Sequence, residues 1–539
     1  MKRNNYIGLL VLTGLLCFAA GSCKKHTEGG AEAEAKEIVL SSYRDGGIDE
    51  LDAASYRGPH FLYKMIYEGF VEDGGEGKII PKLAESWDIG PDNKTYTFHL
   101  RKGIQFSDGT DFNADAVIFN MNRWINNSRH GTLISNKVTS MQALDEYTVE
   151  ILFEDAAYPI ITELTYPRPV RFLSPASVKK EGSDEIVFTK PIGTGPWMID
   201  TYVKDQEFSL VPNPYYWGEK PQVDRILFKV ITDGQARVLA LQSGEIDILG
   251  GDLVAKIPME SVPELKQNPN FTTYIKGTLC AHFIGFNETL PVFQDKNLRL
   301  AMNYAINKKS IAENLFDGAG LEANGLYQAD TPYARPETNY CVPYDTNKAI
   351  ELLEASGYID SDGDGVREKG NARLEFNFVF STGEFPEWKP LAEFIQSEFA
   401  AVGIKTNLSV FDKNGYEEIT LTTRQYDICL KRTASDSWVP HSSLLELFGP
   451  APTALEKGVG NAWFDEGLYQ DILKTLASFD ETERQAHYDN VFGFISEEAL
   501  TIPVYHPTTA FAVNAKKIEN FEVGVNNYAP VEWEKLDVK

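Results

Sequence analysis

The sequence contains few cysteines, few histidines and a marked deficit of basic residues. Among 539 residues there are 5 cysteines and 8 histidines, and 51 lysines and arginines stand against 78 aspartates and glutamates. The formal charge of −27 argues against a nucleic-acid partner, because phosphate binding needs clustered lysine and arginine. We interpret the acidity as a contribution to solubility. No two cysteines have C-x-x-C spacing, so neither a zinc ribbon nor a thioredoxin-type site is expected.

The chain also lacks the signatures of common enzymes. It has no G-x-x-x-x-G-K-[ST], no H-E-x-x-H, no G-x-S-x-G and no kinase signature. Acidic pairs such as Glu497-Glu498 are abundant, but 78 acidic residues make them typical of solvated helix surface. We therefore expect a protein that is not an enzyme and has no resident cofactor.

An apolar run at residues 7–20 follows two basic residues and is too short to span a bilayer comfortably. It fits the hydrophobic region of a signal peptide. The run ends in Ala-Gly-Ser-Cys, which resembles a bacterial lipobox whose cysteine receives diacylglycerol. We therefore predict a signal peptide over 1–22, lipidation of Cys23 and a lipidated polar tether over 23–37. An ordinary signal peptide that happens to contain Cys23 is the alternative.

Length and composition indicate a soluble globular protein of two or three domains. Apolar periodicity predicts alternating helices and strands without internal repeats. The predicted strands are 38–43, 96–100, 374–380, 404–411 and 502–505, and the predicted helices are 59–70, 113–126, 387–401, 465–478 and 482–498. The strand–helix–strand unit over 374–411 implies a parallel sheet with a right-handed crossover. Cys280 and Cys429 lie in apolar, strand-like runs and are expected to be buried thiols.

Residues 360–365 match the opening of an EF-hand calcium loop. Their sequence, Asp-Ser-Asp-Gly-Asp-Gly, places carboxylates at loop positions one, three and five and a glycine at position six. Position twelve is Asn371 and not the bidentate glutamate that closes such a site. We favour an Asp/Gly turn that leads into the strand at 374–380.

Several longer strings resemble one family of proteins, although no general physical rule makes them a fold signal. They are Tyr-Pro-Arg-Pro-Val-Arg-Phe at 166–172, Pro-Ile-Gly-Thr-Gly-Pro-Trp at 191–197, Asn-Pro-Tyr-Tyr-Trp-Gly-Glu-Lys-Pro at 213–221, Ala-Met-Asn-Tyr-Ala-Ile-Asn-Lys-Lys at 301–309 and Lys-Arg-Thr at 431–433. Together they resemble the family 5 solute-binding proteins (dipeptide, oligopeptide and nickel type) that feed ABC importers. Within that family the chain is most similar to the nickel-chelate binders.

The resemblance implies an α/β fold of the two-lobed periplasmic-binding-protein type (class II, cluster C), with an extra subdomain in the first lobe. Two chain crossings would join the lobes, and the ligand would be clamped between them. Lobe 1 would comprise residues 38–275 and 508–539, with the extra subdomain at about 56–170. Lobe 2 would comprise residues 276–507. The protein would be a monomer outside the cytoplasm, lipid-anchored to a bacterial membrane.

Two arginines align with the residues that hold ligand carboxylates in the nickel binders. Arg168 lies between two prolines, which restrict the backbone and so direct the guanidinium. A guanidinium grips a carboxylate bidentately and stays charged in a sealed cleft. Arg129 aligns with the second such arginine. For Arg168 the alternative is a salt bridge within the lobe, and for Arg129 it is an exposed helix end.

The opposite wall of the implied pocket would be residues 432–441, where the chain departs from the nickel binders. Ala434 stands where they carry an aromatic residue, and Trp438 stands where they carry a tyrosine. The relatives also place a metal-ligating histidine about eleven residues after the Pro-His pair, and this chain has no histidine from 442 to 486. Thr132 likewise replaces an aromatic residue near Arg129. The resemblance therefore implies a larger, less aromatic pocket.

Two histidines remain as candidate ligand contacts. His60 aligns with a pocket-lining methionine of the nickel binders, so its imidazole could face a metal and is a tentative metal ligand. His441 follows Pro440 and has packing or helix capping as the alternative. Asp436 is a further candidate, because peptide binders of the family generally offer an acidic anchor to the ligand amine.

The sequence thus predicts a solute-binding lipoprotein that delivers a small anionic ligand to an ABC permease and its ATPase subunits. The leading ligand is a chelate of nickel or a related divalent metal. A dipeptide or short peptide is the alternative ligand. A sensor or chaperone-like lipoprotein that binds without transport is the alternative from another class.

Overall fold

The computed structural model describes residues 35–539, apart from residues 48–49, 55–57, 76, 126–133, 168–170, 182–184, 383–384, 434–439 and 451–460. Residues Lys36–Lys539 form one unit of the chain, and Met1–Ala35 form another. The larger unit is a mixed α/β structure. Across the described residues, no helix is both long enough and apolar enough to cross a membrane.

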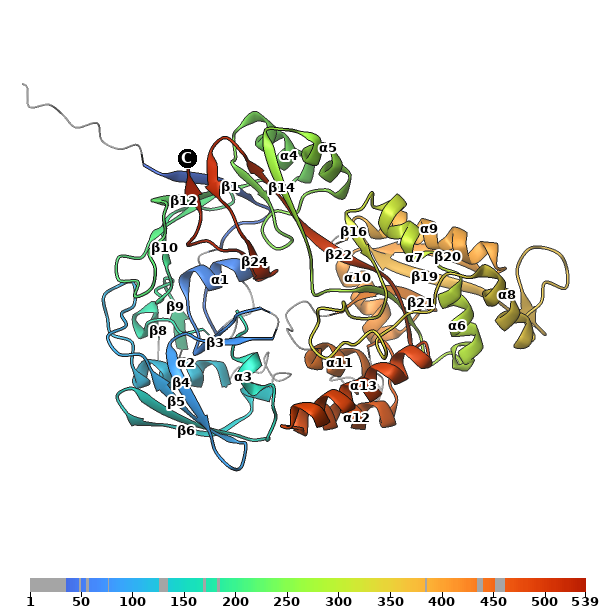
Figure 1. Ribbon diagram of the computed structural model, residues 1–539, viewed down its shortest axis with the longest axis horizontal. Coiled ribbons are helices and arrows are strands. Elements are labelled where there is room, and N and C mark those ends of the chain that lie inside the picture. Colours follow the sequence, from blue (N-terminus) through green and yellow to red (C-terminus); the bar gives the residue numbers. More distant parts are fainter. Residues whose placement is uncertain are drawn as a thin grey trace, which may run out of the picture. The chain divides into compact units, whose positions relative to one another are not determined.

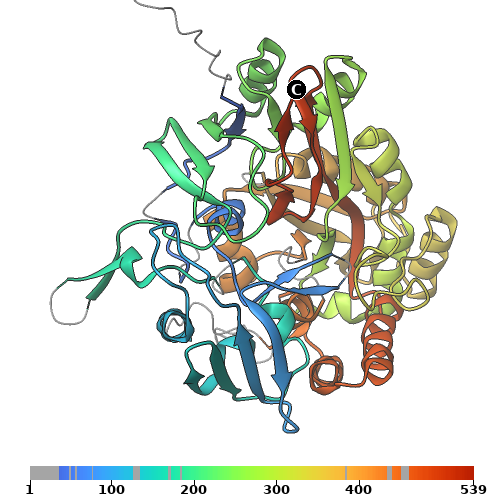
Figure 2. The same cartoon turned by 60° about the vertical axis from the view of Figure 1, so that its left-hand side comes forward.

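One long strand, β22 (Thr501–Asn514), lies at the centre of the main sheet. Its first half pairs antiparallel with β15 (His282–Phe286) and β16 (Gly320–Glu322). Its second half pairs antiparallel with β13 (Ile248–Gly250) and β14 (Phe271–Gly277). The red strand β22 lies beside the green strand β14 in both Figure 1 and Figure 2. A single strand therefore has two sets of partners.

The sequence predicts only a short strand over 502–505 at this place, and that prediction is too short. Pro507 is the physical reason, because proline has no amide hydrogen to donate and ordinarily ends a strand. Here the Pro507 carbonyl accepts hydrogen bonds from the Thr278 amide (3.0 Å) and the Thr278 hydroxyl (3.1 Å). The strand continues past the proline and then pairs with β14.

The remaining strands of the main sheet flank β22 on both sides. The order of the sheet is β10-β11-β12-β1-β13-β22-β15-β21-β19-β20. The further bounds are β10 (Trp197–Val203), β11 (Glu207–Pro212), β12 (Arg225–Val230), β1 (Glu37–Ser42), β21 (Ile428–Arg432), β19 (Glu375–Ser381) and β20 (Lys405–Phe411). The strand predicted at 38–43 is thus confirmed as β1, which is parallel to β12.

The predicted strand–helix–strand unit is confirmed. β19 and β20 are parallel neighbours, and α9 (Trp388–Ala401) connects them. The helix buries Trp388, Leu391, Ile395 and Phe399 at helical spacing, with the half-buried Phe394 packed against the same core. Because these side chains fill one face of the helix, their burial explains why this segment folds as a crossover helix.

A second, four-stranded sheet has the order β4-β5-β7-β6. Its strands are β4 (Ala84–Ile89), β5 (Thr95–Leu100), β7 (Thr148–Phe153) and β6 (Val138–Asp145), and all neighbours are antiparallel. The predicted helix beside it is α2 (Ala114–Ile125), and Asn113 Oδ1 accepts a hydrogen bond from the Ala116 amide at 3.1 Å. That bond confirms Asn113 as the N-terminal cap.

Buried apolar side chains gather into three large cores. The first contains residues between 283 and 505, the second contains residues from 38–67, 173–265 and 511–536, and the third surrounds the four-stranded sheet. Cys280 and Cys429 are buried free thiols, as predicted. Several cores are expected of a chain of 539 residues, because single cores stop growing beyond roughly 250–300 residues.

The remaining helices and the two-stranded pairs of the described residues complete the fold. The helices are α1 (His60–Ile66), α3 (Ile160–Glu163), α4 (Gly234–Ser243), α5 (Val262–Gln267), α6 (Lys296–Tyr304), α7 (Lys308–Ser310), α8 (Thr346–Ala355), α10 (Lys413–Glu417), α11 (His441–Phe448), α12 (Glu466–Ala477) and α13 (Glu481–Glu497). Two-stranded pairs join β2 (Val71–Asp73) to β3 (Ile79–Pro81), β8 (Val178–Glu181) to β9 (Glu185–Phe188), β17 (Glu368–Lys369) to β18 (Ala372–Arg373), β23 (Ile518–Asn520) to β26 (Asp537–Val538) and β24 (Val523–Asn526) to β25 (Ala529–Val531).

Helix α1 is shorter than the predicted 59–70, and a glycine-containing segment lies against its end. Tyr67 has extended backbone angles (φ −120°, ψ 151°), which end the helix. The Gly195 amide donates a hydrogen bond to the Ile66 carbonyl at 2.9 Å. A Cβ atom on Gly193 would lie 2.0 Å from the Ile66 carbonyl oxygen. Close backbone approach therefore explains why this motif carries glycine.

Gly193→Ala should lower the free energy of unfolding by at least about 1–3 kcal/mol. The added methyl group would collide with the Ile66 carbonyl, which belongs to the backbone and cannot move away freely. Gly493→Ala is the matched control, since nothing lies within 4 Å of the Cβ position in α13. It should raise stability by about 0.5–1 kcal/mol. Urea unfolding of both variants checks the prediction, and equal stabilities of the two would contradict it.

Candidate ligand-binding site

Most of the predicted binding residues lie outside the described residues. This holds for Arg129, Arg168, Asp436 and Trp438, and also for the predicted lipidation residue Cys23. Of the predicted contacts, the structure describes His60 and His441. The other four residues lie in segments 126–133, 168–170 and 434–439, and the structure describes the chain directly after each of these. Residues from those following stretches lie close to one short helix, α3.

Glu163, the last residue of α3, joins two of these flanking segments. Its Oε2 accepts a hydrogen bond from the Ser135 amide at 2.7 Å, and its Oε1 lies 3.1 Å from His441 Nε2. Ser135 follows the segment that carries Arg129, and His441 follows the segment that carries Trp438. The side chains of Glu163 and His441 are each 1% exposed. The carboxylate thus fixes two distant parts of the chain to the same buried point.

His441 is the first residue of α11, directly after the N-cap Pro440. With Nε2 paired to Glu163, its other ring nitrogen, Nδ1, is buried and has no hydrogen-bond partner among the described residues. A histidine whose one nitrogen is held by a carboxylate has a fixed ring orientation. The predicted contact of His441 with a ligand stays a prediction, beside packing and helix capping.

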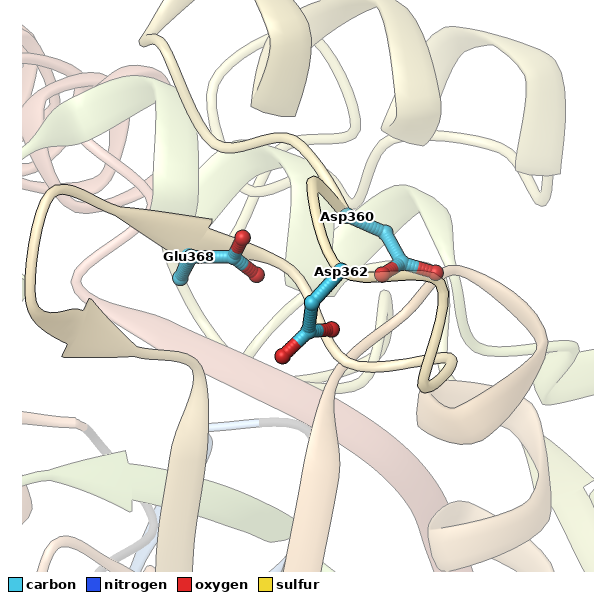
Figure 3. A group of neighbouring side chains, drawn as sticks. All are labelled: Asp360, Asp362 and Glu368. Carbon is cyan, nitrogen blue, oxygen red and sulfur yellow. The ribbon is translucent and has the colours of Figure 1, made fainter.

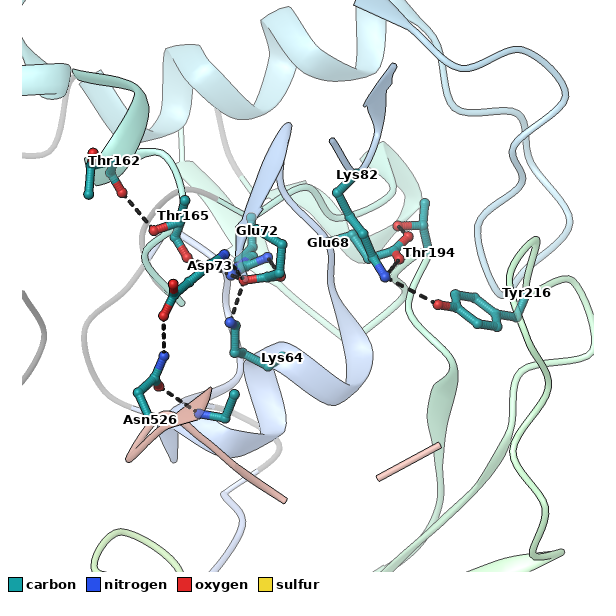
Figure 4. A network of polar contacts seen from close by, with 12 residues as sticks. Lys64, Glu68, Glu72, Asp73, Lys82, Thr162, Thr165, Thr194, Tyr216 and Asn526 are labelled. Atoms are coloured by element: carbon teal, nitrogen blue, oxygen red, sulfur yellow. Dashed lines mark hydrogen bonds and ion pairs between the residues drawn. The ribbon is translucent and has the colours of Figure 1, made fainter. Parts of the chain in front are cut away.

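Arg171 joins the third flanking segment to the end of α3. It follows residues 168–170 directly and donates a hydrogen bond to the Thr165 carbonyl at 2.9 Å. Its side chain is fully buried and donates two more hydrogen bonds to Glu72, at 2.7 Å and 3.0 Å. Lys64 contacts the same carboxylate (Figure 4). A bidentate, charge-assisted pair of this kind holds its backbone firmly in place.

The charges around Glu72 set its protonation. Burial raises the pKa of Glu72, but the neighbouring positive charges of Arg171 and Lys64 outweigh that effect and lower the pKa from 4.5 to about 2. The carboxylate is therefore ionised throughout the neutral range. Its neighbour Asp73 accepts a hydrogen bond from Asn526 Nδ2 at 2.7 Å, so the network reaches the C-terminal hairpin (Figure 4).

A second buried carboxylate, Glu68, links two of the sequence motifs. It accepts hydrogen bonds from the Thr194 hydroxyl (2.9 Å) and from Trp217 Nε1 (2.8 Å), and it pairs with Lys82 at 3.1 Å. Thr194 belongs to the Gly-Thr-Gly motif and Trp217 to the Asn-Pro-Tyr-Tyr-Trp motif. Figure 4 shows Glu68 between Lys82 and Thr194. These motifs therefore build a buried scaffold beside α1.

His60, the other described candidate, is the half-buried first residue of α1. Its ring faces the ring of Tyr528, with 4.4 Å between centroids and a tilt of 49°. Tyr528 lies in the turn between β24 and β25, two residues after Asn526. The aromatic contact positions His60 at the same hairpin that the Glu72–Asp73 network reaches. Its predicted contact with ligand or metal stays a prediction.

The segment before α3 makes a further contact with α12 and α13. Tyr158 and Tyr488 place their hydroxyl oxygens 2.5 Å apart, and the Tyr158 amide donates to the Leu476 carbonyl at 3.0 Å. The Arg484 guanidinium lies 4.2 Å from the centroid of the Tyr158 ring. Together with Glu163–His441, these contacts join residues 158–163 to residues 441–488. No sequence motif pointed to Tyr158 or Glu163, because their partners lie about 300 residues away.

Comparisons of the sequence with known proteins identify one family. The family model "Bacterial extracellular solute-binding proteins, family 5 Middle" matches residues 78–454. The nickel-binding periplasmic protein of Escherichia coli (strain K12) is 32% identical over 487 residues, covering 88% of each chain. Di/tripeptide-binding protein 1 of Pseudomonas aeruginosa (strain UCBPP-PA14) is 27% identical over 562 residues, covering 98% of this chain and 99% of that one.

A solved structure agrees with these matches. The crystal structure of NikA from Brucella suis in complex with Fe(III)-EDTA superposes with a TM-score of 0.84 at 27% identity, covering 93% of this chain and all of that one. The fold is therefore that of a two-lobed solute-binding protein, a class that binds solutes and does not catalyse reactions. The chain belongs to family 5 of the bacterial extracellular solute-binding proteins. Proteins of this family work with an ABC permease and its ATPase.

Removal of one partner of the Arg171–Glu72 pair should cost much stability, and that cost should depend on pH. Arg171→Ala leaves a buried carboxylate with Lys64 alone, so the free energy of unfolding should fall by about 3–5 kcal/mol at pH 7. The folded-state pKa of Glu72 lies below its ordinary value, so this contribution is present above about pH 5 and is lost as the pH falls toward 2. Chemical unfolding of both proteins at pH 7, 5 and 3 measures the difference.

Arg335→Ala is the matched control, because Arg335 pairs with Asp489 with 57% of its side chain exposed. Removal of an exposed pair should change stability by about 0.5 kcal/mol or less. A difference between Arg171→Ala and the wild type that stayed constant from pH 7 to pH 3 would show that Glu72 is not the partner that matters.

Proposed function

We propose that this protein captures a chelate of nickel or a related divalent metal and delivers it to the permease of an ABC importer. The observation that carries the proposal is the 32% identity to the E. coli nickel-binding periplasmic protein across 88% of the chain. The Brucella NikA structure, whose ligand is Fe(III)-EDTA, adds support, because its ligand is a metal held by a polycarboxylate.

An anionic ligand needs cationic partners in its site. We propose that Arg168 and Arg129 pair with its carboxylates, that Trp438 covers its apolar surface, and that His60 and His441 lie close enough to contact the metal or chelator. The contacts of Glu163 support this assignment, because they hold the segments after Arg129 and Trp438 at α3. Arg171 holds the segment after Arg168 at Thr165, two residues beyond that helix. Buried ligand charge needs fixed partners of this kind.

We also propose the lobe boundaries given by the sequence, 38–275 with 508–539 for lobe 1 and 276–507 for lobe 2. The core residues support them, since one core is drawn from 283–505 and another from 38–265 and 511–536. The two crossings would be the chain from β14 to β15 and the strand β22. Ligand that bridges the lobes would shift an open–closed equilibrium toward the closed form.

A dipeptide or short peptide is the second candidate ligand, with Asp436 as the anchor for its amine. Two observations favour this candidate. A di/tripeptide-binding protein matches 98% of the chain, and the substitutions Ala434 and Thr132 remove aromatic residues that nickel binders carry. We further propose that Cys23 carries a lipid anchor that holds the protein at a bacterial membrane.

Thermal unfolding of the protein without its tether should separate the two ligands. The samples contain nickel alone, nickel with excess free histidine, or a dipeptide pool. A ligand present at about 100 times its dissociation constant should add about 2.7 kcal/mol and raise the melting temperature clearly. We expect the rise with nickel plus histidine only. A rise with dipeptides only would replace the metal assignment by the peptide one.

Arg168→Ala should weaken binding of the identified ligand by about 2–5 kcal/mol, because it leaves a buried carboxylate without its partner. Arg335→Ala removes an equally large but exposed guanidinium and should leave the affinity unchanged. Calorimetric titration of both folded variants measures the two affinities. Wild-type affinity in Arg168→Ala would remove Arg168 from the site.

A further inference from the structure

A group of carboxylates lies far along the chain from the residues of the proposed ligand site. Asp360, Asp362 and Glu368 each offer an oxygen atom, and these atoms all lie within 4.8 Å of one another. Asp360 and Asp362 are exposed residues of the loop after α8, whereas Glu368 begins β17. Figure 3 shows the Glu368 carboxylate pointing from the strand toward that loop.

Backbone pairing explains how Glu368 reaches the loop. Ile359 and Glu368 exchange two backbone hydrogen bonds, of 3.1 Å and 2.9 Å, which bring the two ends of the loop together. The Ser361 amide donates to Glu368 Oε1 at 2.9 Å. Asp360 accepts from the amides of Gly363 (2.8 Å) and Gly365 (3.0 Å). The three carboxylates are therefore held in place by the chain itself.

One oxygen of this group is left without a partner. Glu368 as a whole is half-buried, but its Oε2 atom is shielded from solvent and accepts no hydrogen bond from any described residue. A shielded carboxylate oxygen without a donor is costly, and it points to a bound cation that would satisfy it. Exposed Asp/Gly turns are common without a bound ion, whereas a shielded carboxylate oxygen without a donor is not.

In the described part of the chain, Arg373 is the cation that forms ion pairs with this loop. Arg373 lies 2.6 Å from Asp364 and 3.7 Å from Asp362. Among the described residues, no ion pair involves Asp360 or Glu368. Arg373 therefore offsets only part of the repulsion among the carboxylates of Asp360, Asp362 and Glu368. A divalent cation bound between them would offset the rest.

We propose that Asp360, Asp362 and Glu368 bind one calcium ion. All three ligands are hard carboxylate oxygens, the type that calcium prefers, and water would complete its coordination. The sequence favoured a plain turn because Asn371 occupies loop position twelve. In the structure, Glu368 at loop position nine offers the acidic ligand that position twelve lacks. The ion would join the loop to β17, so its role is to stabilise this part of the fold, independently of the transported ligand.

Calcium titration tests the proposal on the full exported chain after it has been stripped with a chelating resin. A soluble chelator is avoided, because the proposed ligand site would itself take a metal chelate. We expect one calcium per chain with a dissociation constant of about 10⁻⁴ to 10⁻³ M, which is typical of extracellular sites. Millimolar calcium should raise the melting temperature, and equal magnesium should raise it less. No heat of binding and no thermal shift with calcium would overturn the proposal.

Substitution of the proposed ligands tests whether calcium binds at this loop. Asp362→Asn keeps the oxygen that accepts the Asp364 amide (3.1 Å) but removes the charge, so the loop should fold while calcium affinity falls at least about tenfold. Glu368→Gln should have the same effect. The control, Glu313→Gln with Glu393→Gln, removes two exposed acidic charges elsewhere and should keep the wild-type affinity. Unchanged calcium binding in both site variants would overturn the proposal.

Discussion

Hydrogen bonding along β22 joins the two parts of the main sheet, and the rest of the molecule depends on that connection. The strand pairs with β15 before Pro507 and with β14 after it. At the change of partners, Thr278 donates two hydrogen bonds to the Pro507 carbonyl, so the two crossing segments are tied to each other. In the proposed open–closed movement of the lobes, these crossing residues would be the ones that bend.

Buried charge has the corresponding role away from the sheet. Glu163 and Arg171 are shielded from water, Glu72 is mostly shielded, and each contacts partners from distant segments. Such pairs contribute little net stability compared with apolar packing, but they penalise every arrangement that leaves one partner alone. These pairs therefore hold the chain segments beside α3 in a single position. The proposed function would benefit from that fixed position, since cations that neutralise a ligand must not be free to relax.

Sequence periodicity predicted the parts of the fold that rest on local patterns. The unit over 374–411 follows from one apolar helix face between two strands, and Asn113 follows from cap chemistry. The length of β22 could not be predicted, because it depends on partners that accept a proline. Glu163, Tyr158 and Tyr528 could not be predicted either, since their roles come from contacts across hundreds of residues. Arg129 and Arg168 came from family resemblance alone, and the glycine motif acquired its physical reason only from its contact with α1.

The identity of the natural ligand is the direct test of the proposed function. Native mass spectrometry of the protein isolated in its exported form, without unfolding, would give the mass of whatever occupies the site, and metal analysis of the same sample would give its metal content. We expect one small polycarboxylate or amino-acid chelate per chain, with one nickel or related divalent metal. Recovery of metal-free dipeptides or tripeptides in equal amount to the protein would contradict it.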